Sequence, residues 1–432
     1  MGSGTLLIFT ESYPFSFAVE DSFIEPEIKA CQREFSQIVL IPTQVLGQRA
    51  TTSNHILVNE DFAHYLQTRR QNIASAFGLA IRSLVSSLLW REFLCQPTVV
   101  LRPSYVLKTL RHISGAFVAK DWAETYLRDH RPRIGNPTML TYWLSSTTTG
   151  LALLKNKNQS LVVCSRAHGI DVYAERQTPP FFPCRDWTLR HIAAVFFTST
   201  HARTYTNMHF PGHEKKLRIA PLGVPAPGWS CQPSSDDHFR IVSCSGIIPV
   251  KRIDLMAQGI AAFAAKFPDR TITWTHIGNG PLRQVVTDWC QDHMPPNVQW
   301  QFIGSLQNHQ VMVFYRDHPI DIFLNMSASE GGRPVAIMEA MSCSIPAIGP
   351  SQGGIPEIIN GTNGLLLPPD PKPEDIAQAL GQALGDRPKM LAMRQAAYQT
   401  WKQSYNSEMN STSFASALRQ LTRSDNDPIP NP

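Results

Sequence analysis

Short apolar runs alternate with helix-like segments throughout residues 239–385. FRIVSCSG (239–246), TITWTHIGNG (271–280) and IDIFLNMS (320–327) are strand-like, and a helix-like segment follows each of them. Apolar strands that alternate with helices are typical of a parallel sheet covered by helices on both faces. The chain begins in the same way, with TLLIFT and QIVLIPT on either side of a helix-like segment. The sequence therefore predicts an α/β protein with doubly wound sheets.

A chain of 432 residues is too long for one ordinary core, which predicts two domains. Residues 224–238, VPAPGWSCQPSSDDH, are rich in Pro, Ser and Asp and have the composition of a linker. Two Rossmann-like domains would face each other across a cleft at the carboxyl ends of their sheets. We expect an N-terminal Rossmann-like domain over 1–225 with a helical segment at about 66–132, a linker over 226–238, a C-terminal Rossmann-like domain over 239–405, and a C-terminal helix packing back on the N-terminal domain with a disordered tail over 406–432.

Composition excludes several classes of protein. Apolar residues make up 43% of the chain and charged residues 17%, as in a globular protein rather than a disordered one. The net charge of +5 is modest for this length and gives no reason to expect a nucleic-acid partner. The eight cysteines include no C-x-x-C pair, and the amino terminus lacks the basic region of a secretory signal. Together these features predict a reducing, cytoplasmic location.

The stretch SASEGGRPVAIMEAMS follows a predicted strand and opens a predicted helix. Gly331 and Gly332 let the backbone approach a ligand closely, and the helix start presents free N–H groups suited to a diphosphate. Glu330 and Glu339 can each accept hydrogen bonds from sugar hydroxyls. The stretch PSQGGIPEII repeats the arrangement with a second Gly-Gly. Such a turn alone is common in α/β proteins, so it does not by itself establish a function.

Residues 327–369 resemble the donor-site signature of glycosyltransferase family 4, a family of retaining enzymes with the GT-B fold. SCSGIIPVKRIDLMAQGI, HIGNGPLR and VQWQFIGSLQNHQV resemble further motifs of that family, so the likeness covers about residues 240–370. SRAHGIDVY, residues 165–173, resembles a branch that contains capsule and lipopolysaccharide-type transferases. The resemblance implies a C-terminal domain that binds a nucleotide sugar and an N-terminal domain that binds the acceptor.

The resemblance also implies roles for single residues at the donor site. Lys251 would neutralise the donor diphosphate, and Glu339 would bind the ribose hydroxyls. Glu330, or the backbone at Gly331 and Gly332, would hold the transferred sugar. The remaining positions that match the donor site are Gly246, Gly304, Leu306, Gly353 and Gly354.

Two departures from the family pattern affect this site. Eight residues separate Glu330 from Glu339, whereas the family usually has seven, so Glu330 is expected to be displaced. Gly246 stands where the family usually has an Arg that pairs with Lys251 in holding the diphosphate. Arg333 is our candidate for the replacement cation, and a solvated surface Arg is an equally good interpretation.

The first half contributes the acceptor side in the same way. His168 would end a strand and lie near the transferred sugar. A lone His at a strand end is more often structural, but the motif around it favours a functional role. Arg166 and Asp171 either brace the loop or meet the acceptor. Glu20 lies after a loop in which relatives often carry a glycine-rich turn, and Phe17 to Val19 stand there instead.

Residues 66–120 carry eight basic residues and one acidic residue. Within them, residues 73–94 show apolar side chains at helical spacing with Arg82 in the middle, which favours an amphipathic helix over a membrane span. The basic, apolar segment suits a surface that touches anionic lipid headgroups or a lipid-diphosphate acceptor. A helical insertion with a solvated basic face explains the composition equally well.

The family resemblance leads us to expect a retaining, metal-independent hexosyltransferase that uses a UDP- or GDP-linked sugar and a small-molecule, glycan or lipid-linked hydroxyl acceptor. It would serve polysaccharide, glycolipid or other glycoconjugate biosynthesis, in the cytoplasm or at the cytoplasmic face of the membrane. No other cofactor is expected, and no Asp-x-Asp pair that would hold a metal lies near the motifs. The alternatives are a non-catalytic GT-B subunit that binds a partner transferase, and a GT-B sugar-nucleotide epimerase or hydrolase.

Overall fold

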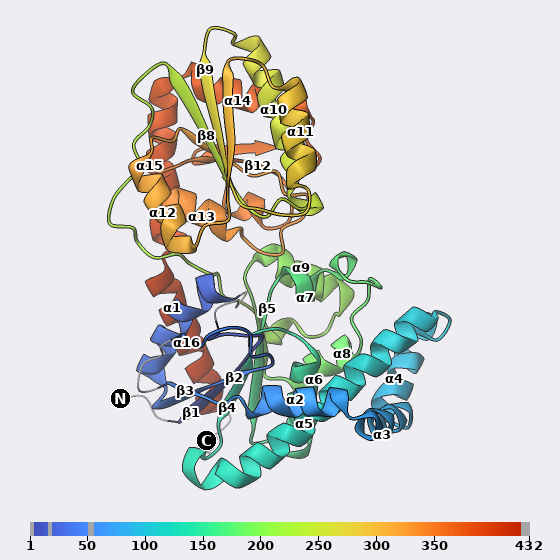
Figure 1. Ribbon diagram of the computed structural model, residues 1–432. Coiled ribbons are helices and arrows are strands. Elements are labelled where there is room, and N and C mark those ends of the chain that lie inside the picture. Colours follow the sequence, from blue (N-terminus) through green and yellow to red (C-terminus); the bar gives the residue numbers. More distant parts are fainter. Residues whose placement is uncertain (1–3, 16–19, 51–55, 425–432) are drawn as a thin grey trace. The chain divides into compact units, whose positions relative to one another are not determined.

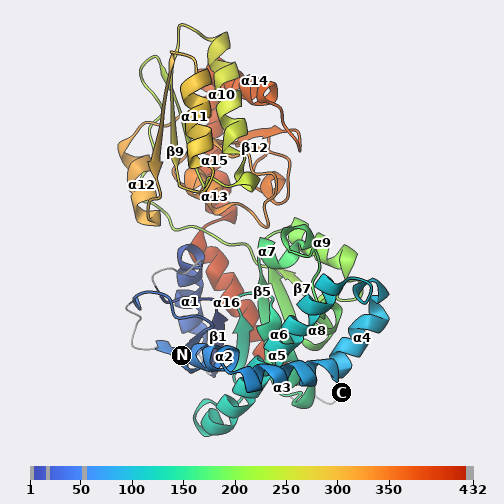
Figure 2. The same cartoon turned by 45° about the vertical axis from the view of Figure 1, so that its right-hand side comes forward.

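The computed structural model divides into two compact units (Figures 1 and 2). It describes residues 4–15, 20–50 and 56–424. Unit 1 contains residues 1–220 and 411–432, and unit 2 contains residues 221–410. The predicted C-terminal tail and the loop at Phe17 to Val19 lie outside the described residues.

Unit 1 contains a seven-stranded parallel sheet with the strand order β3-β2-β1-β4-β5-β6-β7. Its strands are β1 (Thr5–Thr10), β2 (Gln37–Pro42), β3 (Ile56–Val58), β4 (Thr138–Thr141), β5 (Val162–Ala167), β6 (Ala194–Phe197) and β7 (Leu217–Ile219). Its helices are α1 (Asp21–Glu34), α2 (Asp61–Gln71), α3 (Ile73–Leu84), α4 (Ser87–Cys95), η1 (Pro97–Val99), α5 (Pro103–Ile134), α6 (Ser146–Lys157), α7 (Gly169–Val172), η2 (Ala174–Arg176), α8 (Arg185–His191), α9 (Thr200–His209) and η3 (Glu214–Lys216).

The sheet of unit 1 separates two apolar cores. Successive side chains of a strand point to opposite faces of its sheet. Leu7 and Phe9 of β1 accordingly join the core formed with α2, α4, α5, α6, α8 and α9. Leu6 and Ile8 join the core on the other face, formed with α1 and with α16 (Ser407–Ser424). A strand buried on both faces reads as a continuous apolar run, which is why TLLIFT could be recognised as a strand.

Unit 2 contains a six-stranded parallel sheet with the order β10-β9-β8-β11-β12-β13. Its strands are β8 (His238–Cys244), β9 (Thr271–Ile277), β10 (Val298–Gly304), β11 (Ile322–Leu324), β12 (Ala347–Pro350) and β13 (Gly364–Leu367). Its helices are η4 (Pro249–Lys251), α10 (Ile253–Lys266), α11 (Arg283–His293), α12 (Asn308–Asp317), α13 (Val335–Ser342), η5 (Ile355–Glu357), α14 (Pro373–Gly385) and α15 (Arg387–Ser404).

The predicted fold class, two Rossmann-like α/β domains with parallel sheets, is confirmed. Residues 226–238, whose composition is that of a linker, pack on unit 2, since Cys231 is buried and Ser234 donates to Asp321 Oδ2 over 2.6 Å. The helical segment predicted at 66–132 is several helices, and it breaks at Ser86, whose side chain caps α4 by accepting a hydrogen bond from the N–H of Leu89.

Candidate active site

The order of the strands in unit 2 reverses between β8 and β11, which are neighbours in the sheet. Loops that follow the strands on either side of such a reversal leave a crevice at the carboxyl edge of the sheet, where α/β proteins bind ligands. The loop after β8 contains Lys251, and the loop after β11 contains Glu330. Because β12 is the next strand, the loop with Gly353 and Gly354 lies at the same edge. The topology thus gathers the predicted donor residues.

Lys251 and Glu330 form an ion pair across this reversal, with 2.5 Å between Nζ and Oε1. The side chains are 23% and 12% exposed, so the pair is sheltered but open to a ligand. Two hydrogen bonds hold the loops together: the N–H of Ala328 donates to Val250 O over 2.8 Å, and the Arg252 side chain donates from Nε to Met326 O over 2.7 Å. A cation is therefore fixed where the two loops meet.

Gly353 and Gly354 pack directly against the backbone of the turn that follows Glu330. A Cβ atom built on Gly353 would lie 2.3 Å from Glu330 O, and one on Gly354 would lie 2.4 Å from Gly332 O. Gly353 also has a φ of +55°, which favours glycine. The second Gly-Gly therefore allows the two loops to touch, and it supports the turn that carries Glu330, Gly331 and Gly332.

Glu339 lies on α13 and is buried, with 7% of its surface exposed. Its Oε1 accepts a hydrogen bond of 2.5 Å from Asn308 Nδ2, at the start of α12. Burial raises the pKa of Glu339 to about 7, although the Asn308 bond favours the charged form. Sequence reasoning missed Asn308, and the signal for it was its place two residues after Leu306, a predicted donor position.

The other predicted donor positions differ in their surroundings. Gly246 is exposed, and a Cβ there would meet nothing closer than 3.7 Å. Gly304 ends β10 with a φ of +82°, and Leu306 packs partly buried on the core under α12 and α13. Arg333, the candidate replacement cation, is ion-paired with Glu357 over 2.6 Å. The structure therefore places the charge of Arg333 next to a carboxylate, whereas Gly246 leaves space for a side chain.

Unit 1 has a similar reversal between β1 and β4, and Glu20 follows β1. Glu20 is fully buried, and its Oε1 accepts hydrogen bonds from Trp143 Nε1 at 2.9 Å and from the N–H of Glu11 at 2.5 Å. Its Oε2 is buried with no hydrogen-bond partner within the described part of the chain. Trp143, which follows β4, was not predicted, and no motif singled it out.

His168 follows β5 directly and is buried at 8% exposure. Its ring lies 4.7 Å from the Trp143 ring and 5.3 Å from the Phe23 ring, measured between centroids. Burial, with the nearby positive charge of Arg166, lowers the pKa of His168 to about 3. The ring is therefore neutral near pH 7, and its buried Nε2 has no hydrogen-bond partner among the described residues.

Asp171 and Arg166, both predicted on the acceptor side, make their contacts with other residues of unit 1 and so hold its structure together. Asp171 accepts hydrogen bonds from the N–H groups of His168 and Leu144, over 2.5 and 2.7 Å, and so braces the loop that carries the histidine. Burial raises the pKa of Asp171 to about 6. Arg166 is fully buried and bound to both carboxylate oxygens of Glu27. Its guanidinium is thus withdrawn from any acceptor, which corrects the acceptor-side assignment of Arg166.

No group of three or more His, Cys, Asp or Glu side chains is arranged to hold a metal ion among the residues that the structure describes. The site in unit 2 instead offers one lysine, two carboxylates and a glycine-lined turn. These are groups that can bind a phosphate and hydroxyls.

The chain therefore has two Rossmann-like domains, and the second of them has a site suited to a phosphate and hydroxyls. Residues 238–386 match the family model described as Glycosyl transferases group 1, so unit 2 contains a glycosyltransferase domain of that group. The chain is 24% identical over 238 residues to the phosphatidylinositol N-acetylglucosaminyltransferase gpi3 subunit of Schizosaccharomyces pombe, a match of 54% of this chain and 50% of that protein. It is 28% identical over 218 residues to WcaL of Escherichia coli, provisionally described as a colanic acid biosynthesis glycosyltransferase, with 48% and 52% covered. The chain thus spans about half the length of these curated relatives.

Solved structures resemble the whole chain more completely. The lipopolysaccharide outer core galactosyltransferase WaaB, in its apo form, has a TM-score of 0.67 at 14% identity and covers 96% of this chain and 99% of its own. Sucrose-phosphate synthase of Thermosynechococcus elongatus has a TM-score of 0.68 at 14% identity, with 98% and 100% covered. HepE of Anabaena, crystallised with UDP and glucose, has a TM-score of 0.59 at 14% identity, with 96% and 100% covered. At these identities the likeness shows the fold alone, and that fold is GT-B.

Proposed function

We propose that the protein is a retaining glycosyltransferase that moves a hexose from a nucleoside-diphosphate sugar to a hydroxyl acceptor. The observation that carries this proposal is the Lys251–Glu330 ion pair at the β8/β11 reversal, inside the segment that matches the family. A lysine held at the edge of a sheet, beside a turn that admits close backbone approach, suits a diphosphate. The carboxylate of Glu339 accepts hydrogen bonds from the ribose hydroxyls.

The proposed reaction is a front-face displacement at the anomeric carbon. The acceptor hydroxyl oxygen forms a bond to that carbon while the bond to the diphosphate oxygen breaks. The hydroxyl proton passes to the departing diphosphate, so no protein nucleophile is required. Lys251 stabilises the negative charge that develops on the leaving diphosphate. This electrostatic stabilisation is the contribution of the protein to lowering the barrier. Glu330, released from Lys251 as the phosphate binds, holds a hydroxyl of the transferred sugar.

Unit 1 supplies the acceptor side in this proposal. His168 is neutral near pH 7 and has a buried, unpartnered Nε2, which suits a hydrogen bond to a sugar hydroxyl. Glu20 has an unpartnered carboxylate oxygen of the same kind. We propose that the reaction needs no metal or other cofactor, uses a UDP- or GDP-linked sugar, and takes place in the cytoplasm. The names of the gpi3 subunit and WcaL support an acceptor in glycolipid or polysaccharide synthesis.

The test is a panel of UDP-, GDP- and ADP-sugars, assayed for donor binding by calorimetry and for turnover by product mass. We expect one donor to bind and to be consumed with an added glycan or lipid-linked acceptor. Binding without turnover for any acceptor would favour the non-catalytic subunit. Release of free sugar without transfer would favour a hydrolase, and an altered sugar still attached to its nucleotide would favour an epimerase.

Two pairs of variants assign the binding to this site. Lys251→Ala removes the charge beside the diphosphate and should weaken donor binding by about 10- to 100-fold, whereas Lys266→Ala, on an exposed lysine of α10, should not. Gly246→Arg adds a second cation at a position with room for it and should tighten binding. Its control, Gly361→Arg, lies at a turn where a Cβ meets nothing within 4 Å. Unchanged donor affinity in Lys251→Ala would remove the lysine from the site.

A further inference from the structure

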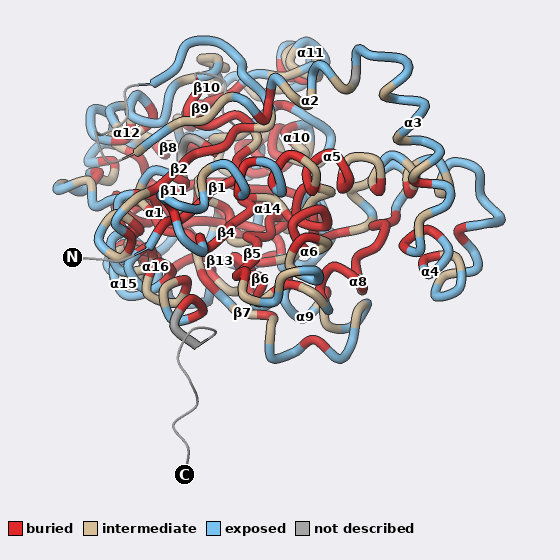
Figure 3. The backbone as a smooth tube through the Cα atoms, turned by 90° about the horizontal axis from the view of Figure 1, so that it is seen from below, coloured by how far each residue is buried: buried red, intermediate tan, exposed pale blue. Residues whose placement is uncertain are grey.

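Helix α3 turns its apolar face outward. Ile73, Phe77, Ile81 and Leu84 recur at intervals of three and four residues and so form one stripe. All four are exposed, Ile73 to 86%. A surface helix of a globular protein usually buries such a stripe against the core. Figure 3 shows α3 drawn largely in the colour of exposed residues.

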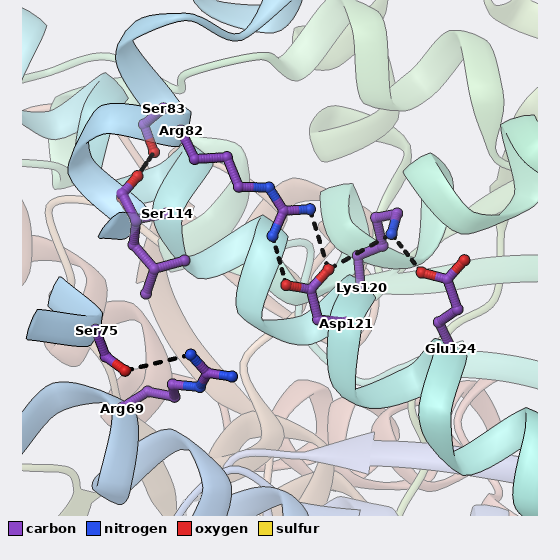
Figure 4. A network of polar contacts seen from close by, with 9 residues as sticks. Arg69, Ser75, Arg82, Ser83, Ser114, Lys120, Asp121 and Glu124 are labelled. Atoms are coloured by element: carbon purple, nitrogen blue, oxygen red, sulfur yellow. Dashed lines mark hydrogen bonds and ion pairs between the residues drawn. The ribbon is translucent and has the colours of Figure 1, made fainter. Parts of the chain in front are cut away.

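The opposite, polar face of α3 is fixed to α5 (Figure 4). Arg82 makes a two-point ion pair with Asp121, with contacts of 2.5 and 3.0 Å, and its guanidinium lies 4.1 Å from the centre of the Phe117 ring. Ser83, which is fully buried, bonds Ser114 over 2.9 Å. These contacts fix the orientation of the helix on α5. The apolar stripe is therefore exposed because its helix is held in place, and not because the helix is loosely packed.

Helix α4 repeats the arrangement after a bend of 49°. Leu88 and Leu89 are buried in the core of unit 1, and they anchor the helix. Trp90 and Leu94, one turn apart on the opposite side, are exposed, Leu94 to 82%. Directly after α4, Leu101 is also exposed. The outward face of the α3–α4 pair is therefore apolar along both helices.

The charge around this face has one sign. Between Asp61 and Asp121 the only acidic residue is Glu92, and it is buried, so it adds no exposed negative charge. Arg91, Arg102 and Arg111 are exposed in the same segment. Apolar side chains flanked by arginines without exposed acids match the interface of an anionic bilayer, where acyl chains accept the apolar groups and headgroups pair with the cations.

We propose that the apolar outer face of α3 and α4 docks unit 1 on an anionic lipid bilayer, lying in the plane of the interface. Among the described residues no single helix is long and apolar enough to cross a membrane, and the bent α3–α4 pair reaches the required length and composition only when the two are taken together. One face of each helix is packed on unit 1 through Arg82 and Leu89, which leaves only the other face for lipid. An anionic bilayer therefore contacts the helices from one side.

The test is partition of the full-length protein into vesicles, measured by flotation. Vesicles of phosphatidylcholine with about a third phosphatidylglycerol are compared with vesicles of phosphatidylcholine alone. We expect binding to the anionic vesicles, weakening as NaCl is raised because salt screens the arginines. Trp90 is 58% exposed and should move into a less polar environment, giving a blue-shifted emission that Trp90→Phe removes while binding remains.

Matched variants on another helix of unit 1 give the control. Phe77→Ser should reduce partition roughly tenfold, since it removes a large apolar side chain from the interface. Arg91→Gln and Arg102→Gln should each reduce it about fivefold on anionic vesicles only. Met208→Ser and Arg203→Gln change equally exposed residues of α9 and should leave partition unchanged.

Three results would overturn the proposal. The first is no vesicle binding together with concentration-dependent self-association that Phe77→Ser abolishes, which would make the face an interface between copies of this chain. The second is equal binding to neutral and anionic vesicles, which would remove the role of the arginines. The third is an equal loss in the α3 and α9 variants. None of these measurements depends on transferase activity, so failure here leaves the proposed function untouched.

Discussion

At the scale of single residues, burial and ligand binding favour opposite protonation states of Glu339. Burial raises its pKa to about 7, yet hydroxyl donors bind best to the ionised carboxylate. Since the proton must leave before the ribose is bound, we expect donor affinity to increase as pH rises through about 7. Between pH 6 and pH 8 the gain should be about tenfold for one linked proton. Calorimetry with an intact nucleotide sugar measures it, because that donor has no terminal phosphate to titrate.

The control for this pH dependence is Glu339→Gln, which has no proton to lose. The variant should bind the donor more weakly at pH 8 and with a flat profile from pH 6 to pH 8. If it kept the slope of the unaltered protein, the titrating group would lie elsewhere. The charge of Glu339 acts on the Cys244 and Cys343 thiols, but burial raises the pKa of each to about 12, so both stay neutral across this range.

Residue identities at the site could be predicted from the sequence, but their partners could not. The two glutamates and the first Gly-Gly stand in a recognisable order, because one loop and one helix contain them. Asn308 contacts Glu339 across 31 positions of the chain, and Trp143 contacts Glu20 across 123. Such contacts depend on how strands neighbour each other in the sheet, which local patterns do not specify.

At the scale of elements, the turn after β11 and the loop after β12 form one packed unit through Gly354. Gly354→Ala would bring a methyl group to 2.4 Å from Gly332 O, so the turn must shift or the contact must strain by about 1–3 kcal/mol. We expect weaker donor binding with the rest of unit 2 folded, measured by calorimetry and circular dichroism. Gly361→Ala, where a Cβ has space, is the control. Equal donor affinity in both variants would separate the second Gly-Gly from the site.

Helix periodicity has a limit that α3 makes clear. The spacing of Ile73, Phe77 and Ile81 predicts a helix with an apolar face, and the structure has that helix. The spacing does not say which way the face points, because this depends on the Arg82 contact with Asp121 on α5. Strand β3 was missed because its apolar run is only three residues long and none of the three is buried, so the run is too short to stand out as a strand.

At the scale of the whole molecule, the chain leaves unit 1 for unit 2 and then returns. Helix α16 follows unit 2 in sequence, yet Phe414, Ala415, Leu418 and Leu421 belong to a core of unit 1. The two-domain fold itself was predictable, since buried parallel strands can be recognised in the sequence as continuous apolar runs. The partners of α16 do not follow from its periodicity, which indicates a buried face without specifying what covers it.

Substitution of Phe414 would measure how much α16 contributes to the stability of unit 1. Its ring is 1% exposed, lies 5.1 Å from the Phe196 ring, and carries the Arg166 guanidinium 4.2 Å above it. Phe414→Ala should cost about 3–5 kcal/mol in the free energy of unfolding of unit 1, because it leaves a cavity beneath a buried charge. Hydrogen exchange followed by mass spectrometry should show faster exchange in peptides of β1, β5 and β6, with β8 and β11 unchanged. Ser413→Ala, at an exposed neighbour, should change neither set. Equal acceleration in both units would mean that the two unfold together.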